Sequence, residues 1–212
     1  MTRGSPAAPA AWQGRAFDAT LETVLQTRRL DLEPLNEAHA DVLWAPLADP
    51  RLYSHVPQDP PLSLDALRER FVLLSARRSP QGDQLWLNWV MRERGAGPYR
   101  GRLQATVTGD AMAWIAYEVF PPHWGRGFAS EGCRRMIEWL IDELGVRQFV
   151  AEVDSLNAAS LRLLDRLGFA RTAWREAADR FKERVSDEWT LRLDAVSFVR
   201  ESPVPDAATG SG

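Results

Sequence analysis

The residues best suited to chemistry lie at positions 119–130, where two glycines stand between a predicted strand and a predicted helix. Such a junction directs several unpaired backbone N–H groups and the positive end of the helix dipole toward one point. Gly125 and Gly127 let the backbone approach a ligand closely. Ser130 can add a hydroxyl group and Arg126 a positive charge. The pattern therefore predicts a site for a phosphate group.

Spacing separates this loop from two other phosphate-binding loops. The segment does not contain G-x-x-x-x-G-K-[ST], and the dinucleotide fingerprint requires a third glycine or an alanine where Ser130 stands. A Gly-x-Gly pair also occurs in loops that serve only as turns. The loop alone therefore leaves a purely structural role open.

Two motifs resemble the GNAT superfamily of acyltransferases. The segment Trp124-Gly125-Arg126-Gly127-Phe128-Ala129 fits the superfamily's Q/R-x-x-G-x-G/A signature, with Trp124 in place of Gln or Arg. Residues 157–169 match an N-x-x-S-x-x-[LV]-x-x-x-L-G-F motif at every fixed position. Together with the strand before the loop, these motifs resemble the branch that contains the ribosomal-protein N-terminal acetyltransferases. The resemblance extends over roughly residues 22–193.

The resemblance implies that the chain binds acetyl-CoA or a related acyl-CoA. The amides of residues 125–130 would hold the pyrophosphate, and the main chain of Val119 and Phe120 would pair with the pantetheine arm. Asn157 and Ser160 would contact that arm or position the leaving sulfur, although Asn157 is equally suited to capping a helix. The implied cofactor-binding residues are Val119, Phe120, Trp124, Gly125, Arg126, Gly127, Phe128, Ala129, Ser130, Asn157 and Ser160.

Glu118 and the main chain of Val119 are the expected catalytic groups. An amide near Val119 would polarise the thioester carbonyl and stabilise the developing oxyanion. Glu118 lies on the strand that would deliver the cofactor, where burial favours proton uptake by a carboxylate. The alternative is a carboxylate that simply faces outward from an alternating strand, opposite to its two neighbours.

The general acid has no obvious candidate. Many superfamily members use a tyrosine late in the second motif to protonate the thiol, but Leu163 and Leu164 stand there in this chain. His55 and His123 are further titratable residues, although isolated histidines in loops usually have no catalytic role. Cys133 falls on the apolar face of a predicted helix, which indicates packing rather than nucleophilic attack. We therefore expect direct acyl transfer within a ternary complex.

The predicted elements form an α+β fold, and the resemblance implies a GNAT fold with a mixed, mostly antiparallel sheet of about seven strands and about four helices. The acyltransferase domain is assigned to residues 21–195. A disordered segment (residues 1–20) and a flexible tail (residues 196–212) are expected to flank it, because both are rich in Ala, Pro, Gly and Ser. Helices are predicted at residues 37–47, 63–76, 129–144 and 158–167, and strands at 29–33, 85–91, 102–108, 114–120, 149–153, 172–177 and 184–193.

Composition excludes several partner classes. The 26 Lys and Arg nearly balance the 29 Asp and Glu, so no overall positive field attracts nucleic acid or an anionic membrane. No run of apolar residues is long enough for a membrane helix or a secretory signal. The single cysteine fits a reducing compartment and belongs to no metal-ligand spacing. We expect a cytoplasmic protein without a bound metal, and a homodimer joined through exposed sheet edges is compatible with the sequence.

The predicted reaction is transfer of an acetyl group from acetyl-CoA to a primary amine, on a peptide N-terminus or a small molecule. One alternative is a larger donor such as succinyl-CoA, and another is a catalytically silent module that binds acyl-CoA. The resemblance implies that residues 47–62, with the two helices that they connect, form most of the acceptor pocket. These residues contain no acidic cluster that would indicate a polycationic acceptor.

Overall fold

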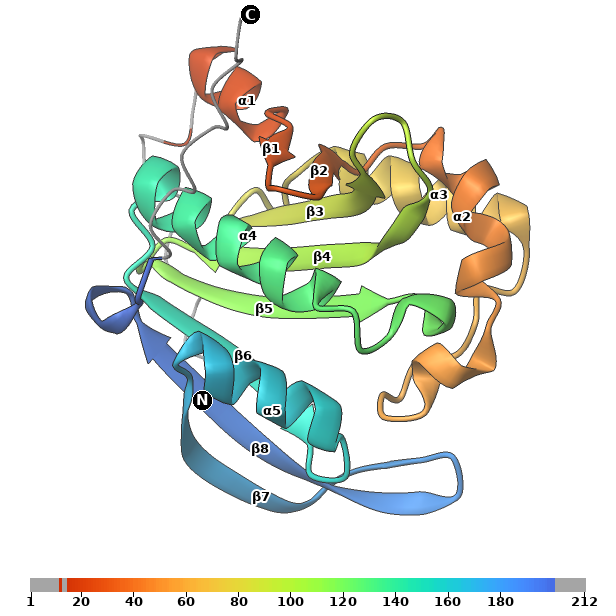
Figure 1. The fold of residues 1–212 in the computed structure, drawn as a ribbon, viewed down its shortest axis with the longest axis vertical. Coiled ribbons are helices and arrows are strands. Elements are labelled where there is room, and N and C mark those ends of the chain that lie inside the picture. The colour runs from red at the N-terminus through yellow and green to blue at the C-terminus, as the bar shows by residue number, and fades with distance from the viewer. Residues whose placement is uncertain (1–11, 13–14, 201–212) are drawn as a thin grey trace, which may run out of the picture.

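An eight-stranded sheet runs through the centre of the molecule (Figure 1). The computed structural model describes residue 12 and residues 15–200. All neighbouring strands are antiparallel except β5 and β6, and their order is β1-β2-β3-β4-β5-β6-β8-β7, which confirms the predicted α+β class. The strands are β1 (Leu25–Gln26), β2 (Leu30–Pro34), β3 (Gln84–Glu93), β4 (Tyr99–Thr108), β5 (Met112–Val119), β6 (Gln148–Asp154), β7 (Ala170–Phe181) and β8 (Arg184–Asp194).

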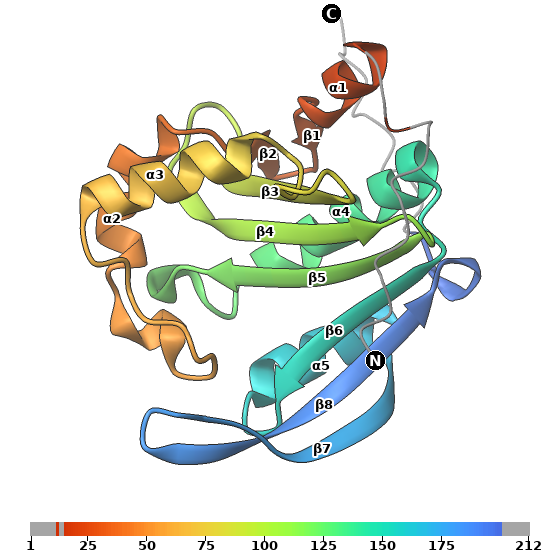
Figure 2. The same cartoon turned by 180° about the vertical axis from the view of Figure 1, so that it is seen from behind.

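Helices cover both faces of this sheet. The helices α4 (Phe128–Leu144) and α5 (Ala158–Leu167) lie on one face (Figure 1). On the other face lie α2 (His39–Leu47) and α3 (Leu64–Ser75), as Figure 2 shows. The core is divided accordingly into a larger cluster that includes Trp89 and Phe149 and a smaller one around Phe71. None of the described helices is both long and apolar enough to cross a membrane.

Helix ends follow the signals in the sequence. Ser63 caps α3 by accepting a hydrogen bond from the amide of Ala66, at 3.1 Å. Asn157 caps α5 in the same way through the amide of Ser160, also at 3.1 Å. Gly145 and Gly168 end α4 and α5 with positive φ values of 63° and 93°, a conformation that glycine adopts at low cost. The predicted bounds of α5 are confirmed to the residue.

The N-terminal region differs from the prediction. Residues 15–20 belong to a short helix, α1 (Arg15–Leu21), so the expectation of disorder through residue 20 is wrong for them. Trp12 and Leu21 are buried in the larger core cluster, and Glu22 pairs with Arg77 at 2.9 Å. With β1, this helix accounts for the difference from the expected seven strands and four helices. At the other end Phe198 is buried in the same cluster, and residues 201–212 of the predicted tail lie outside the described residues.

The two parallel strands diverge. β5 and β6 pair only through residues 112–114 and 148–150. Beyond these pairs β5 continues to Val119 and β6 to Asp154 without contacting each other as strands, and Figure 1 shows the two arrows separating. The unpaired edge of β5 therefore leads directly into the glycine loop.

β4 and β5 approach each other unusually closely at Gly101. A Cβ at this position would lie 2.0 Å from the carbonyl oxygen of Glu118 and 2.8 Å from Cα of Val119. We expect Gly101→Ala to force the strands apart and to lower the free energy of unfolding by about 2 kcal/mol. Thermal denaturation would then show a fall in Tm of about 4–8 °C.

Gly95→Ala is the matched control for this prediction. Gly95 has a positive φ of 72°, but a Cβ there would meet no atom within 4 Å. This variant should lose only about 1 kcal/mol, from backbone strain. If Gly101→Ala were no less stable than Gly95→Ala, the close approach of β4 and β5 would not be real.

Candidate functional site

The glycine loop connects β5 to α4. After Val119 the chain makes a single 3-10 turn, η3 (Pro121–His123), before α4 begins at Phe128. Gly125 and Gly127 have positive φ values of 73° and 79°. Both glycines therefore occupy the left-handed region that residues with a Cβ disfavour.

The amides of this loop are available to a ligand. Within the residues that the structure describes, no protein group accepts a hydrogen bond from the N–H groups of residues 125–130. A Cβ at Gly125 would meet no atom within 4 Å, and one at Gly127 would meet only Arg29 Nη2, at 3.5 Å. This open cradle at the N-terminus of a 17-residue helix fits the pyrophosphate of an acyl-CoA. It brings together the predicted residues Gly125, Arg126, Gly127, Phe128, Ala129 and Ser130.

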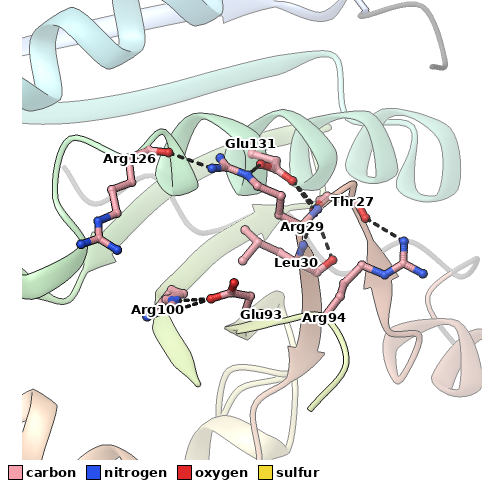
Figure 3. Close-up of polar contacts among 8 residues, drawn as sticks. All are labelled: Thr27, Arg29, Leu30, Glu93, Arg94, Arg100, Arg126 and Glu131. Carbon is pink, nitrogen blue, oxygen red and sulfur yellow. Dashed lines mark hydrogen bonds and ion pairs between the residues drawn. The ribbon is translucent and has the colours of Figure 1, made fainter. Parts of the chain in front are cut away.

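An ion pair that we did not predict holds the loop against the first long strand (Figure 3). The carboxylate of Glu131, in the first turn of α4, accepts hydrogen bonds from Arg29 Nε at 2.6 Å and from the Arg29 amide at 2.8 Å. It also accepts one from the Thr27 hydroxyl at 2.7 Å. Arg29 Nη1 donates to the carbonyl of Arg126 at 3.0 Å. Arg29 therefore ties β2 both to the loop and to the helix that follows it.

This contact also neutralises a negative charge near the phosphate cradle. Burial raises the pKa of Glu131, but hydrogen bonds from Thr27 and Arg29 outweigh it, and the pKa lies below its usual range. Glu131 is therefore ionised at neutral pH and is paired with a guanidinium. The contribution of this pair to stability is full above the usual carboxyl pKa and is lost as pH falls through the lowered value.

Glu131→Gln should weaken the binding of acetyl-CoA about tenfold, because the loop loses the charge-assisted contacts that fix it. Isothermal titration calorimetry measures this change. Asp142→Asn is the control, since Asp142 lies on the same helix and forms an exposed ion pair with Arg200, at 2.6 Å. Equal affinities for acetyl-CoA in the two variants would show that Arg29 and Glu131 do not position the loop.

The register of β5 assigns its backbone groups to two directions. The amide of Phe120 donates to the carbonyl of Arg100 at 2.9 Å. Backbone groups alternate along an antiparallel pair, so the N–H of Val119, opposite Gly101, points away from β4 and toward the gap beside β6. The Val119 carbonyl accepts a hydrogen bond from the indole of Trp124 at 2.5 Å. The predicted pairing of the cofactor arm with Phe120 is therefore wrong for its amide, which is already bound within the sheet.

Glu118 faces a cavity on the side of the sheet that α2 and α3 cover. Its cross-strand partner is Arg102, and Arg102 Nε donates to Glu118 Oε1 at 2.5 Å. The cavity has a volume of about 380 Å³ and lies between β3, β4, β5, α3 and the segment after α2. Its walls include Tyr53, Leu67, Asn88, Arg102, Gln104 and Glu118. This is the position that the resemblance implied for the acceptor.

Two further contacts shape the cavity. The Tyr53 hydroxyl donates to the carbonyl of Leu47 at 2.8 Å. Burial and the nearby Glu118 carboxylate raise the pKa of Tyr53 to about 12, so its phenol stays protonated. At the far rim Lys182, between β7 and β8, forms an ion pair with Asp59. The β7–β8 hairpin therefore contacts one side of this cavity.

Asn157 and Ser160 lie at the start of α5, which follows β6. The side chain of Asn157 caps this helix, so its capping role is confirmed, and its contact with a cofactor stays a prediction. The Ser160 hydroxyl lies 2.7 Å from the hydroxyl of Tyr117 on β5. Tyr117 is a residue of the site that the sequence analysis did not single out.

The remaining titratable candidates differ in their surroundings. His55 Nδ1 is buried without a hydrogen-bond partner among the described residues, and Asp154 Oδ1 lies 3.8 Å from it. Burial and the positive charge of Arg100 lower the pKa of His123, which indicates a neutral ring. Cys133 is fully buried, and burial raises the pKa of its thiol, which argues against a nucleophilic role. Among the described residues, no group of three or more His, Cys, Asp or Glu is arranged to hold a metal ion.

Comparisons with known proteins identify the family. A family model described as an acetyltransferase (GNAT) domain matches residues 29–170. The uncharacterized N-acetyltransferase p20 of Bacillus licheniformis is 24% identical over 169 residues, which are 80% of this chain and 94% of that protein. The structure of Mycobacterium smegmatis RimJ in complex with CoA-disulfide is similar, with a TM-score of 0.72 at 17% sequence identity. The similar region covers 84% of this chain and 90% of the RimJ chain.

The ribosomal-protein-S5-alanine acetyltransferase of Vibrio fischeri has the same fold, with a TM-score of 0.72 at 12% identity, over 84% of this chain and 99% of its own. The match to the family model runs from Arg29 to Ala170, the first residue of β7, and includes the glycine loop and the motif at the start of α5. The chain therefore belongs to the GNAT acetyltransferase family and is an acyl-CoA-dependent N-acetyltransferase.

Proposed function

We propose that the protein transfers an acetyl group from acetyl-CoA to a primary amine, on a peptide N-terminus or a small molecule, within a ternary complex. The observation that carries this proposal is the arrangement around the end of β5. The free amides of the glycine loop lie at its end, and the acceptor cavity begins at Glu118. A donor bound along the gap would thus meet an acceptor in the cavity beside residues 118 and 119.

Residues on β5 would perform the chemistry. The Glu118 carboxylate faces the cavity and would accept the proton that the amine loses. Arg102 holds this carboxylate in place. The N–H of Val119 points into the gap and would donate a hydrogen bond to the carbonyl oxygen of the acetyl group as negative charge develops there. The loop amides of residues 125–130, with Asn157 and Ser160, would bind the rest of acetyl-CoA.

A peptide N-terminus is the acceptor class that we favour. The cavity opens between elements from three parts of the chain, residues 47–61, 67–74 and 88–118, and so offers an extended approach to Glu118. The structural neighbours named RimJ and ribosomal-protein-S5-alanine acetyltransferase share the fold. A small-molecule amine is the second candidate, supported by a relative named FsC-acetyl coenzyme A-N(2)-transacetylase from Aspergillus fumigatus.

Calorimetric titration with acetyl-CoA, succinyl-CoA and free CoA tests the donor. A thiol-release assay with short peptides bearing free or blocked N-termini, and with simple amines, then tests the acceptor. We expect acetyl-CoA to be consumed in the presence of a free N-terminus only. Faster turnover of succinyl-CoA would establish the larger donor, and binding without turnover of any donor would establish a silent module. Absence of binding by any of the three would remove the basis of the proposal.

A further inference from the structure

We propose that Tyr117 positions the hydroxyl group of Ser160 so that Ser160 donates a hydrogen bond to the sulfur of the leaving CoA. This inference rests on the proposed acetyl transfer and supplies the group that stabilises the departing thiolate. The Tyr117 and Ser160 hydroxyl oxygens are 2.7 Å apart. Tyr117 also lies 3.3 Å from the Ser160 carbonyl oxygen. These contacts join the exposed edge of β5 to the first turn of α5.

The register of β5 places this phenol opposite to the predicted base. Tyr117 pairs across the sheet with Leu103, and Glu118 pairs with Arg102. Residues that are directly paired share a face of the sheet, and successive residues alternate between faces. Tyr117 therefore points toward α4 and α5, whereas Glu118 points into the acceptor cavity. The Val119 amide follows both residues in the sequence and points into the gap beside β6. Tyr117, Glu118 and Val119 therefore supply one group on each face of the sheet and one group in the gap.

Either hydroxyl of the pair can donate to the other, and the proposal requires the arrangement in which Tyr117 donates. Burial raises the pKa of Tyr117 far above its usual range, so the phenol remains protonated and can donate. The charged and titratable groups near it are Cys133, whose buried thiol is neutral, and Arg166. Apart from Tyr117, the described residues include no partner for the Ser160 hydroxyl. If Tyr117 donates to Ser160 Oγ, the hydrogen of Ser160 is left for another acceptor.

Ser160 is also fixed from its backbone side. Its amide donates to Asn157 Oδ1 at 3.1 Å, which sets the first turn of α5, and Tyr117 sets the rotamer of the hydroxyl. Ser160 is only partly buried, which is compatible with contact to a ligand in the gap. The side chain is therefore held in one orientation before any ligand binds, which reduces the cost of the interaction.

The step is balanced without proton transfer from either hydroxyl. The amine nitrogen forms a bond to the acetyl carbon, the C–S bond breaks, and its electron pair stays on sulfur. Glu118 takes the proton from the amine, and Ser160 donates a hydrogen bond to the new thiolate. Tyr117 stays neutral throughout, as its raised pKa requires. Tyr117 is thus a positioning residue, and Ser160 is the residue that would contact the reacting sulfur.

This arrangement accounts for the absence of a tyrosine on α5. Leu163 and Leu164, which stand where many superfamily members have that tyrosine, are both buried in the core. A phenol at either position would have to displace core contacts. In this chain a phenol approaches the same helix from the neighbouring strand instead.

Tyr117→Phe and Ser160→Ala, singly and combined, test the inference. We expect each single variant to lower kcat about tenfold while the Kd for acetyl-CoA changes less than twofold. The double variant should be no slower than Ser160→Ala, because Tyr117 acts through Ser160. Tyr99→Phe is the control, since Tyr99 is a partly buried phenol that bonds to Glu33 at 3.3 Å, away from the gap.

A spectroscopic titration separates positioning from a purely structural effect. The thiolate absorbance of CoA bound to the wild-type protein should appear at lower pH than in either variant, because the hydrogen bond favours the thiolate. Cys133 does not interfere, because it is buried with a raised pKa and is the only cysteine.

Unchanged kcat and unchanged CoA titration in Ser160→Ala would overturn the inference while leaving acetyl transfer intact. Additive losses of kcat accompanied by a lower Tm, with no shift in the CoA titration, would also overturn it. If the wild-type protein itself fails to consume acetyl-CoA, the failure belongs to the proposed function instead. Because Ser160→Ala removes only one partly buried oxygen, it tests the idea even if Tyr117→Phe does not fold.

Discussion

Gly127→Glu should weaken the binding of acetyl-CoA by at least about a thousandfold, or about 4 kcal/mol. Three effects combine in this substitution. Residue 127 has a φ of 79°, so any Cβ strains the backbone. The new side chain would fill the cradle formed by the free amides of residues 125–130. Its negative charge would also repel the pyrophosphate that the helix N-terminus otherwise attracts.

Gly82→Glu is the matched control for this variant. Gly82 has a similar φ of 74° and open space around it, so the substitution adds the same strain and charge. It lies just before β3, whose first residue pairs with Thr108 at the end of β4 that is remote from the loop. Calorimetry should give this control the affinity of the wild-type protein. If the Gly127 variant still binds acetyl-CoA normally, the loop is a turn and the cofactor lies elsewhere.

Features encoded within a few residues were the ones that the sequence predicted well. Ser63 and Asn157 act as caps through contacts with residues only three positions away, so their roles can be recognised without knowing the fold. The same is true of the glycine loop, because its dihedral angles and its free amides arise from the junction itself. Alternation along β5 likewise indicated that Glu118 faces away from Tyr117 and Val119.

Contacts between distant residues were not predicted. Arg29 and Glu131 are 102 positions apart, and the spacing of charges along the chain carries no information about which of many arginines meets which carboxylate. The signal that could have found them is indirect, since both residues lie within the stretch, roughly residues 22–193, over which the chain resembles the GNAT superfamily. The hydroxyl pair of Tyr117 and Ser160 was missed for the same reason.

Composition misled the assignment at the N-terminus. The first residues are rich in Ala, Pro and Gly, which usually indicates that too little apolar surface is available for folding. Apolar residues of this segment nevertheless find a surface to pack on: Trp12 is buried in the larger core cluster, and Phe17 packs against it. Such docking depends on a partner surface formed by residues far along the chain, and a local average cannot detect it.

Glu118→Gln should lower kcat about a hundredfold and leave the Kd for acetyl-CoA within twofold of the wild-type value. Glutamine preserves the size of the side chain and an oxygen that Arg102 can bond, but it cannot accept the proton of the amine. Glu118→Asp keeps a carboxylate at a shorter reach and should retain more activity than the glutamine variant. Steady-state kinetics with a saturating peptide acceptor, and calorimetry with acetyl-CoA, measure the two quantities.

Glu152→Gln makes the same chemical change on the neighbouring strand and should leave kcat unaltered. Glu152 is exposed on β6, whereas its neighbour Val153 is buried in the core. Because successive residues of a strand point to opposite faces of the sheet, Glu152 faces the same side as Glu118. The pattern of losses assigns the role of Glu118. A loss confined to kcat identifies the base, whereas a higher KM for the acceptor with unchanged kcat identifies a residue that only binds the ammonium group. If neither quantity changes, the proton is accepted elsewhere, and the acceptor must approach the Val119 amide without contacting the carboxylate that Arg102 holds in the cavity.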